Sequence, residues 1–582
     1  MRTDAFMTSP SSEVTVGGPE TSGAAGPGTD EIMAAHVPIA PGHLQMLRRG
    51  TKYFTGLDET LFNNITACKA LVRCLRSCYG PRGSNKLVVN HLGKVFLTSD
   101  AATILKELEI ENPAARLLRT ASESQEQEVG DGTNFVVLLA GSLLENAEGL
   151  LRLGLPVSDV ITGYEMASKK VLKILKNLCC SSVENIRDVA QTARGLQTVI
   201  GSKLTGYEEF LAKLVAESCI SVLTPEGQFN ADNVRVCKII GASILHSSLL
   251  EGMVFKRKAE GCVTSVMDAK VAIYSCGFGM MNTETAGTVL LESAADLMNF
   301  GNCQENLMET RVLSILKTGV NVVVVAGKVE DLALYYADRY KLMVVRMTSR
   351  YDMRHLAKAT GATILMTLVP PLIEDIGHCD QVYLDEIGDT QVVIFKKQKN
   401  CSSVTTIILR GSTEELLSNV EQGVTNAVKV YQVLTMNATL VPGAGATEIE
   451  LCVKLRFLGV THPGTEHYGI LEFAHALESL PRALAENAGL NVNEAMARLK
   501  AVHQLQAPNV GFNLVGDGPD TVDAAKAGIL DSFLVKHWGI KLATNVAVTL
   551  LGISHIVMAK KSGGPKPRGE NPNWDLEPDM ID

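Results

Sequence analysis

The chain has 582 residues, 46% of them hydrophobic and 20% charged, and its formal net charge is -9. A globular chain of this length should divide into about two to four domains, because single cores stop growing at roughly 250–300 residues. The mild negative charge argues against a nucleic-acid partner, which requires clustered Lys and Arg, and nothing in the composition favours an anionic membrane.

Cysteine usage and the chain termini indicate a cellular location. The 13 cysteines are scattered, with one adjacent pair at 179–180 and without CxxC motifs or His partners at zinc-site spacing. This pattern is typical of reduced thiols in a reducing compartment. No apolar run approaches the roughly 18 residues of a membrane span, and the N-terminus lacks the basic and apolar regions of a signal peptide. We therefore expect a cytoplasmic protein that does not enter a membrane.

Both ends of the chain have the composition of tails. Residues 1–32 are rich in Ser, Gly, Pro, Thr and Glu. Such a segment cannot bury enough apolar surface to offset its ordering entropy, which predicts a disordered N-terminal extension. Residues 563–582, which begin Gly-Gly-Pro-Lys-Pro, are predicted to form a flexible C-terminal tail of the same kind.

A first helical block is predicted over about 44–155. Within it, apolar residues recur at helical spacing from Val136 to Leu151, which predicts a helix with one buried face. The motif Gly-Asp-Gly-Thr at 130–133 directly precedes this stripe. It places flexible backbone and a carboxylate at a helix N-terminus, where free N–H groups favour phosphate.

The middle of the chain alternates between two kinds of element. Strands are predicted at 322–325 and 342–345, and helices at 329–341 and 352–360. Alternation at this length predicts a βαβ layer with a parallel sheet. Because no GxGxxG follows a strand, a dinucleotide-binding fold is disfavoured.

From about Gly443 the sequence returns to long helices. These helices are predicted at 447–457, 472–488, 492–503 and 540–550. A helical module that is interrupted by an α/β insertion and then resumes indicates a discontinuous domain. The fold class that follows is α+β and multidomain.

Four short motifs occur in order along the chain. They are Gly-Pro-Arg-Gly at 80–83, Ser-Asp-Ala-Ala-Thr-Ile-Leu at 99–105, Gly-Asp-Gly-Thr at 130–133 and Pro-Gly-Ala-Gly-Ala-Thr-Glu at 442–448. Glycine lacks a Cβ, so glycine-bearing turns can bring backbone N–H groups close to a phosphate. The chain has neither GxxxxGK[ST] nor the kinase loop set, so a P-loop or kinase mechanism has no support.

Together, the four motifs resemble the nucleotide site of a group II chaperonin, and the resemblance extends from about Met33 to about Trp574. It implies a mostly helical equatorial domain, a small intermediate domain and an α/β apical domain with a helical protrusion. The implied boundaries are 33–155 and 435–562 for the equatorial domain, 156–244 and 401–434 for the intermediate domain, and 245–400 for the client-binding apical domain.

The resemblance also implies which residues bind ATP or ADP with Mg²⁺. Asp131 should hold the Mg²⁺, because a hard carboxylate oxygen suits a hard cation. Asp100 should face the γ-phosphate and help to orient water, and Lys203 should sense that phosphate. The other residues implied to surround the phosphates, ribose and base are Tyr79, Gly80, Pro81, Gly132, Thr133, Asn134, Phe135, Gly443, Ala444, Gly445, Asp531 and Lys536.

Three positions depart from the pattern that the resemblance implies, and the first of them, Ala101, replaces a common glycine. Ala444 stands at the second of three usual glycines, where its methyl group costs about 1 kcal/mol if φ must be positive. Asn426 stands where the family has a carboxylate that polarises the attacking water. An amide cannot accept a proton from water, and losing a general base costs about 10²- to 10⁴-fold in rate. Thr425 and Ala427, on either side, offer no carboxylate in its place.

Two functions follow as alternatives. The first is an ATPase-type subunit of a double ring of paralogous chaperonin subunits, which encloses unfolded clients such as cytoskeletal proteins. The second is a catalytically silent paralogue with a structural or binding role, and Asn426 distinguishes the two. A metabolic enzyme built on the middle layer is disfavoured, because that layer has no cofactor motif.

Residues 280–300 match the apical protrusion. Its apolar residues are either client or lid contacts or the buried face of an ordinary packed helix. They are Met280, Met281, Leu290, Leu291, Leu297 and Met298.

Overall fold

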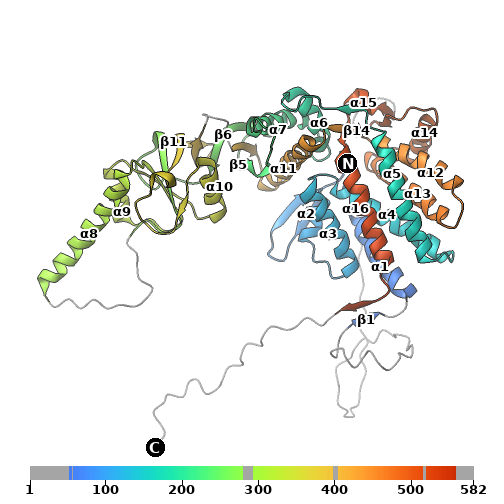
Figure 1. Ribbon diagram of the computed structural model, residues 1–582, viewed down its shortest axis with the longest axis horizontal. Helices are drawn as coiled ribbons and strands as arrows, with labels where there is room; N and C mark the ends of the chain where they lie inside the picture. The colour runs from blue at the N-terminus through green and yellow to red at the C-terminus, as the bar shows by residue number, and fades with distance from the viewer. Residues whose placement is uncertain (1–51, 55–56, 280–292, 398–403, 515–519, 559–582) are drawn as a thin grey trace, which may run out of the picture. The chain divides into compact units, whose positions relative to one another are not determined.

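The computed structural model describes residues 52–54, 57–279, 293–397, 404–514 and 520–558 (Figure 1). Residues 54–556 belong to one compact unit, and the described residues 52–53 and 557–558 belong to a second. A two-stranded sheet pairs β1 (Lys52–Phe54) with β18 (Ile556–Met558). The predicted tails, 1–32 and 563–582, lie outside the described residues.

Long helices from both ends of the larger unit share one hydrophobic core (Figure 1). Each has an apolar side, which it must bury against another element. They are α1 (Leu57–Arg76), α3 (Pro113–Glu128), α4 (Thr133–Arg152), α5 (Val157–Lys176), α12 (Ala446–Thr461), α13 (Glu466–Ala488) and α16 (Phe533–Leu551). Three shorter helices belong to the same part of the chain: α2 (Ala101–Glu107), α14 (Val492–Gln504) and α15 (Ala524–Ala527).

Helix α4 is the centre of this bundle and packs against α1, α3, α13 and α16. The predicted apolar stripe is buried from Val136 to Leu150, with Leu151 half-buried, and Glu145, Gly149 and Arg152 are exposed. Val137 and Leu138 are buried as well, so the buried face is wider than predicted. A helix with such a wide apolar face belongs in the interior of a large protein.

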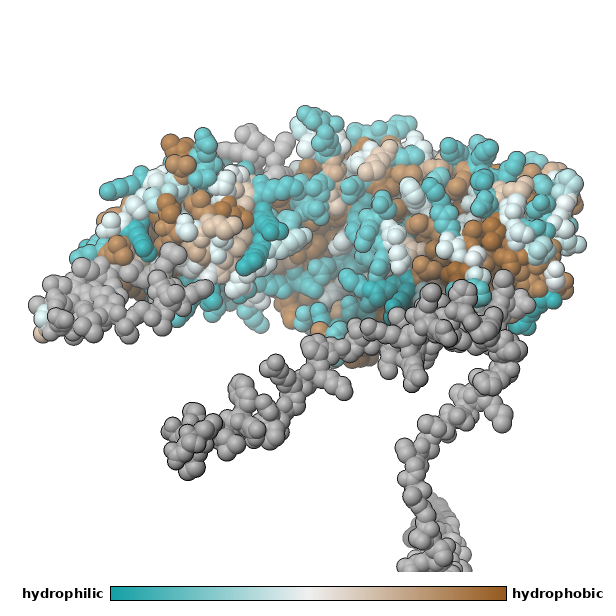
Figure 2. Space-filling model, turned by 60° about the horizontal axis from the view of Figure 1, so that its bottom comes forward, coloured by the Kyte–Doolittle hydropathy of each residue, from teal (hydrophilic) through white to brown (hydrophobic). Residues whose placement is uncertain are grey.

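The expectation that no apolar run is long enough for a membrane span is wrong for α4. Its 20 residues are long and apolar enough by composition, but 67% of the most apolar window is buried inside the protein. Figure 2 shows the described residues of one face as a mixture of hydrophilic and hydrophobic patches. The apolar character of α4 is therefore explained by its place in the core.

The middle of the chain forms a sheet of nine strands in the order β5-β13-β6-β12-β11-β7-β8-β9, with β10 paired to β7. Strands β7, β8 and β9 run parallel, and Val323 pairs with Ala272 on one side and Val344 on the other. The predicted parallel layer is right for these strands, but β6, β11 and β12 pair antiparallel and make the sheet mixed. The bounds are β5 (Val234–Ile240), β6 (Ser248–Phe255), β7 (Ser265–Tyr274), β8 (Val322–Val325), β9 (Met343–Arg346), β10 (Ile364–Leu365), β11 (Gly377–Ile387), β12 (Thr390–Lys396) and β13 (Thr405–Gly411).

Both faces of this sheet are covered. Helices α8 (Ala294–Lys317) and α9 (Asp331–Arg339) share a core with Val323 and Val325, whereas α10 (Arg350–Thr360) shares one with Val322 and Val324. A strand buried on both faces is expected to be a continuous apolar run, as the four valines of β8 are.

The predicted protrusion falls mostly outside the described residues. Met280, Met281, Leu290 and Leu291 are not described, and neither is the side chain of Leu297. Met298, in the first turns of α8, is 74% exposed.

The remaining elements carry the loops of the candidate site. Helices α6 (Val189–Gly201), α7 (Glu208–Val222) and α11 (Glu414–Met436) share a core with β5 and β13. Three small sheets pair β2 (Lys86–Val89) with β3 (Val95–Thr98), β15 (Val510–Phe512) with β16 (Thr521–Asp523), and β14 (Thr439–Pro442) with both β17 (Leu530–Ser532) and β4 (Ser181–Ser182).

Candidate functional site

A cavity of about 310 Å³ gathers most of the residues that the sequence singled out. Those that line it are Tyr79, Gly80, Pro81, Asp131, Gly132, Thr133, Asn134, Phe135, Lys203, Ala444, Gly445, Asp531 and Lys536. Asp100, Asn426 and Gly443 are not among the lining residues. The cavity therefore joins segments that are up to several hundred residues apart in sequence.

The N-terminus of α4 opens into this cavity. Gly132 is the N-cap residue with φ +82° and makes no side-chain cap, so the N–H groups of the first turn are available to a ligand. A Cβ on Gly132 would lie 2.9 Å from Cγ1 of Val535, so both the backbone angle and the available space require glycine. Gln125 supports this turn by donating from Nε2 to the carbonyl oxygens of Asp131, at 2.9 Å, and Val535, at 3.2 Å.

The side chain of Asn134 joins three of the loops. Its Nδ2 donates to the carbonyl oxygens of Cys78, at 3.1 Å, and Ser99, at 3.0 Å. Its Oδ1 accepts from the backbone N–H of Ala101 at 2.6 Å. Asn134 was expected to cradle phosphate, but its amide is engaged with the chain and fixes the relative positions of the first three motifs.

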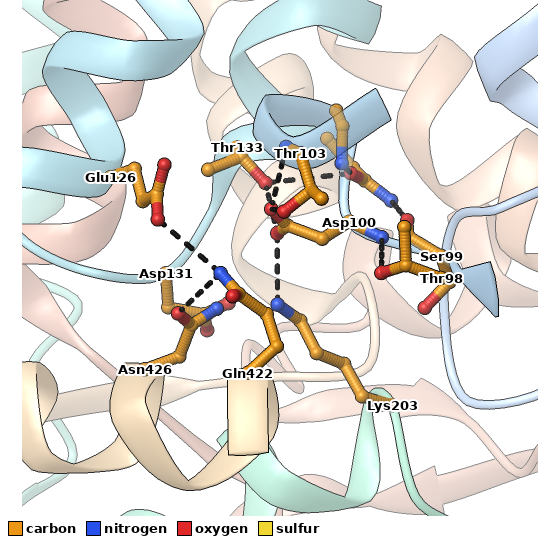
Figure 3. A network of polar contacts seen from close by, with 12 residues as sticks. Thr98, Ser99, Asp100, Thr103, Glu126, Asp131, Thr133, Lys203, Gln422 and Asn426 are labelled. Atoms are coloured by element: carbon orange, nitrogen blue, oxygen red, sulfur yellow. Dashed lines mark hydrogen bonds and ion pairs between the residues drawn. The ribbon is translucent and has the colours of Figure 1, made fainter. Parts of the chain in front are cut away.

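Asp100 is buried, 1% exposed, and fully engaged (Figure 3). Its Oδ1 lies 2.8 Å from Nζ of Lys203 and accepts from the Thr133 hydroxyl at 2.9 Å. Its Oδ2 caps α2 by accepting from the backbone N–H and the hydroxyl of Thr103, at 3.1 and 3.0 Å. Burial alone would raise the pKa of Asp100, but Lys203 and these hydrogen bonds lower it below its ordinary value. Asp100 is therefore an ionised anchor for Lys203 in this arrangement.

Asp131 has the opposite environment. Burial raises the pKa of Asp131, and the charge of Lys203 offsets that rise only in part. Among the described residues, no side chain donates a hydrogen bond to its carboxylate, and no cluster of three or more His, Cys, Asp or Glu forms a metal site. A half-buried cavity carboxylate without an ion-pair partner among the described residues fits Mg²⁺, which protein carboxylates bind in ones or twos while substrate phosphates and water supply the other ligands.

Lys536 also lines the cavity and lies between two carboxylates. Its Nζ is 2.5 Å from Oε1 of Glu448 and 3.1 Å from Oδ2 of Asp531, and it lies over the ring of Phe135 at 4.8 Å from the centroid. Burial would lower the pKa of Lys536, but Asp531 and Glu448 raise it well above its ordinary value. The lysine is therefore charged and neutralises acidic groups that would otherwise repel a polyphosphate.

We expect Lys536→Met to lower the free energy of unfolding by about 3–5 kcal/mol, because it leaves the carboxylate of Glu448, which is 2% exposed, without a counterion. Urea unfolding followed by the fluorescence of Trp538 in the same helix measures the change. Lys541→Met is the matched control, since Lys541 is exposed on α16. Equal effects of the two substitutions would contradict a buried ionic cluster.

Asn426 lies on α11, beside the turn that carries Asp131 (Figure 3). It is fully buried, and its Oδ1 accepts from Nε2 of Gln422 at 3.4 Å. The same Nε2 lies 3.3 Å from Oε1 of Glu126, whereas Nδ2 of Asn426 has no hydrogen-bond partner among the described residues. Helix α11 is pressed so closely onto the turn that a Cβ on Gly130 would lie 2.4 Å from Cβ of Lys429.

Comparison with known proteins decides the family. The TCP-1/cpn60 chaperonin family matches residues 71–561. The chain belongs to this chaperonin family. It is 54% identical over 543 residues to the T-complex protein 1 subunit theta of Homo sapiens, covering 93% of this chain and 99% of the relative, and also to that of Gallus gallus over the same length. Identity to the theta subunit of Caenorhabditis elegans is 43% over 539 residues, covering 92% of this chain and 98% of the relative.

These relatives confirm the resemblance to a group II chaperonin and the α+β multidomain fold class that it implied, and they show that the chain is of the theta type. They leave the individual site residues to be argued from geometry. Several lining residues had no sequence signal, because they lie outside glycine-bearing motifs. They include Gln197, Thr198, Glu208, Phe512 and Asn513.

Ala444 has a positive φ, the backbone conformation in which its methyl group carries an energetic cost. Its φ is +54°, in the left-handed region that favours glycine. Its carbonyl oxygen accepts from the N–H of Phe512 at 3.0 Å, which ties the late glycine loop to β15. The condition for a penalty at this position, a positive φ, is therefore met.

We expect Ala444→Gly to raise the free energy of unfolding by about 1 kcal/mol, because glycine adopts a positive φ without the Cβ clash. Ala446→Gly is the control of opposite sign, since Ala446 is fully buried at the start of α12 and glycine loses the packing of its methyl group, at a cost of about 1 kcal/mol. Urea unfolding of both variants checks the pair. A loss of stability in both variants would show that Ala444 is not strained.

Proposed function

We propose that this chain is a cytoplasmic chaperonin-ring subunit that binds Mg-ATP and hydrolyses it slowly or not at all. The proposal rests on a contrast between two parts of the site. The cavity contains the residues expected to bind Mg-ATP, whereas Asn426, on the helix α11 beside the turn that carries Asp131, is a buried amide. When bound, Mg-ATP supplies the phosphoanhydride whose hydrolysis drives the ring's cycle.

The residues of the chain account for binding in physical terms. The open N-terminus of α4 offers N–H groups to the phosphates, Asp131 offers one oxygen to Mg²⁺, and Lys203 offers a positive charge beside them. Gly445, Ala444 and Asp531 line the part of the cavity assigned to ribose and base. The acceptor that would take a proton from water is the missing part, since Asn426 cannot act as a base.

The proposed domain division is equatorial at 33–155 and 435–562, intermediate at 156–244 and 401–434, and apical at 245–400. The core shared by α1, α4, α13 and α16 supports a split equatorial domain. Limited proteolysis tests the division, because residues 33–155 should not survive alone. Their release as a stable fragment would contradict it.

Asn426 also supports the alternative of a silent paralogue that assembles without turning over ATP. In either case the proposed partners are paralogous subunits in a double ring, with unfolded proteins as clients of the complete ring. Sizing the protein from its native cytosol separates ring membership from a role outside the ring. Elution as a free monomer would contradict the proposal.

A further inference from the structure

A second cavity of about 310 Å³ lies at the start of α10, in the α/β part of the chain. It is lined by β5, the end of β6 and the segment that leads from β9 into α10. None of its lining residues belongs to the nucleotide cavity. Its charged lining consists of Arg235, Lys238, Lys256, Arg257 and one carboxylate, Asp352.

Two of these four cations are already neutralised. Nη2 of Arg235 lies 3.0 Å from Oδ1 of Asp352, and Nζ of Lys238 lies 2.8 Å from Oε2 of Glu421. Among the described residues, no carboxylate pairs with Lys256 or Arg257. Within the part of the chain that the structure describes, two exposed cations at one cavity therefore have no carboxylate partner, although the net charge of the chain is -9.

The polar groups around these cations are suited to an anion. Nη2 of Arg257 donates to the Thr348 hydroxyl at 2.7 Å, so a neutral partner holds the Arg257 guanidinium at the cavity. Helix α10 begins beside it, and its N-cap Ser349 satisfies only the N–H of Asp352. Other N–H groups of that turn lack helical partners, and the helix dipole adds positive potential at this end.

The floor of the cavity is apolar. Met253, Phe255 and Cys237 line it, and all three are buried. Lys256 lines the same cavity as this floor. The cavity thus combines cations, a helix N-terminus and an apolar base.

We propose that this cavity binds a small, multiply charged anion of the phosphate class. The volume equals that of the nucleotide cavity, which leaves room for more than one phosphate group. Two free cations and a helix N-terminus match a ligand with at least two negative charges. The inference does not depend on ATP hydrolysis, since the two cavities share no residue.

Inorganic tripolyphosphate is the probe, and hydrogen exchange of the full chain is the measurement. We expect protection of residues 234–240 and 347–352 on adding tripolyphosphate. In Lys256→Gln/Arg257→Gln this protection should require about tenfold more ligand or more, because two charge-assisted contacts are lost. Exchange at residues 78–83 and 130–135 reports separately on the nucleotide cavity and should be the same in both proteins.

Lys258→Gln/Lys270→Gln is the matched control, because it removes the same charge at exposed positions of the same sheet region outside the cavity. It should behave like the unmodified chain. Equal protection in both double variants, or none in the unmodified chain, would overturn the proposal. Stronger protection of the same segments by a hexaglutamate peptide would also overturn it, in favour of an acidic polypeptide ligand.

Discussion

Asn426→Asp is expected to raise single-turnover hydrolysis of Mg-ATP by about 10²-fold or more. The substitution is nearly isosteric and restores both a negative charge and a proton acceptor beside the phosphate turn. Nε2 of Gln422, which now donates to Oδ1 of Asn426 at 3.4 Å, can donate to the new carboxylate in the same way. Phosphate release from one equivalent of bound ATP measures the effect.

Thr425→Asp is the control for this substitution, because it adds the same charge one residue away on the partly exposed side of α11. It should leave hydrolysis unchanged. Thermal unfolding of both variants checks that the buried aspartate is tolerated. If the unmodified chain hydrolyses ATP as fast as Asn426→Asp, the role given to this position is wrong, and Asp100 must act despite its ion pair with Lys203.

The parts of the site that could be predicted from the sequence are those encoded locally. A positive φ is found at Gly80, Gly132 and Gly445, at +91°, +82° and +82°. Each of these residues lies in one of the four glycine-bearing motifs described above. The long helices were equally predictable, because their apolar periodicity is set by the buried core. The predicted range 492–503, for example, differs from α14 by a single residue.

The parts that could not be predicted depend on contacts distant in sequence. Gln125 bonds the carbonyl of Val535, 410 residues away, and Gln422 bonds Glu126, 296 residues away. Neither glutamine lies in a recognisable motif, so only the folded chain places it. The mixed character of the sheet was hidden for a related reason, since a short apolar run is compatible with either parallel or antiparallel pairing.

Asp100 shows a different limit of sequence reasoning. Its motif predicted a carboxylate near the γ-phosphate, and the carboxylate does lie next to Lys203 and Thr133. A motif does not reveal whether a carboxylate is free or paired. The ion pair and its lowered pKa make Asp100 a weak proton acceptor, which increases the importance of position 426 for hydrolysis.

Asp131→Ala is expected to weaken Mg-ATP binding by about 10²-fold or more, because it removes the cavity carboxylate at the turn before α4, which we expect to hold Mg²⁺. Isothermal titration with Mg-ATP measures the loss. Chelation of Mg²⁺ by EDTA should weaken binding to the unmodified chain and have little further effect on the variant. Asp159→Ala, on α5 and outside the cavity, is the control.

The thermal stability of Asp131→Ala distinguishes a loss of Mg-ATP binding from misfolding of the variant. Burial raises the pKa of Asp131 in the folded chain, so ionisation of this carboxylate destabilises the ligand-free fold. The destabilisation grows as the pH rises above the pKa that Asp131 has in the unfolded chain. Asp131→Ala should therefore unfold at the same or a higher temperature than the unmodified chain at neutral pH without ligand. A variant that is equally stable and still binds Mg-ATP with unchanged affinity would show that Asp131 does not hold the metal.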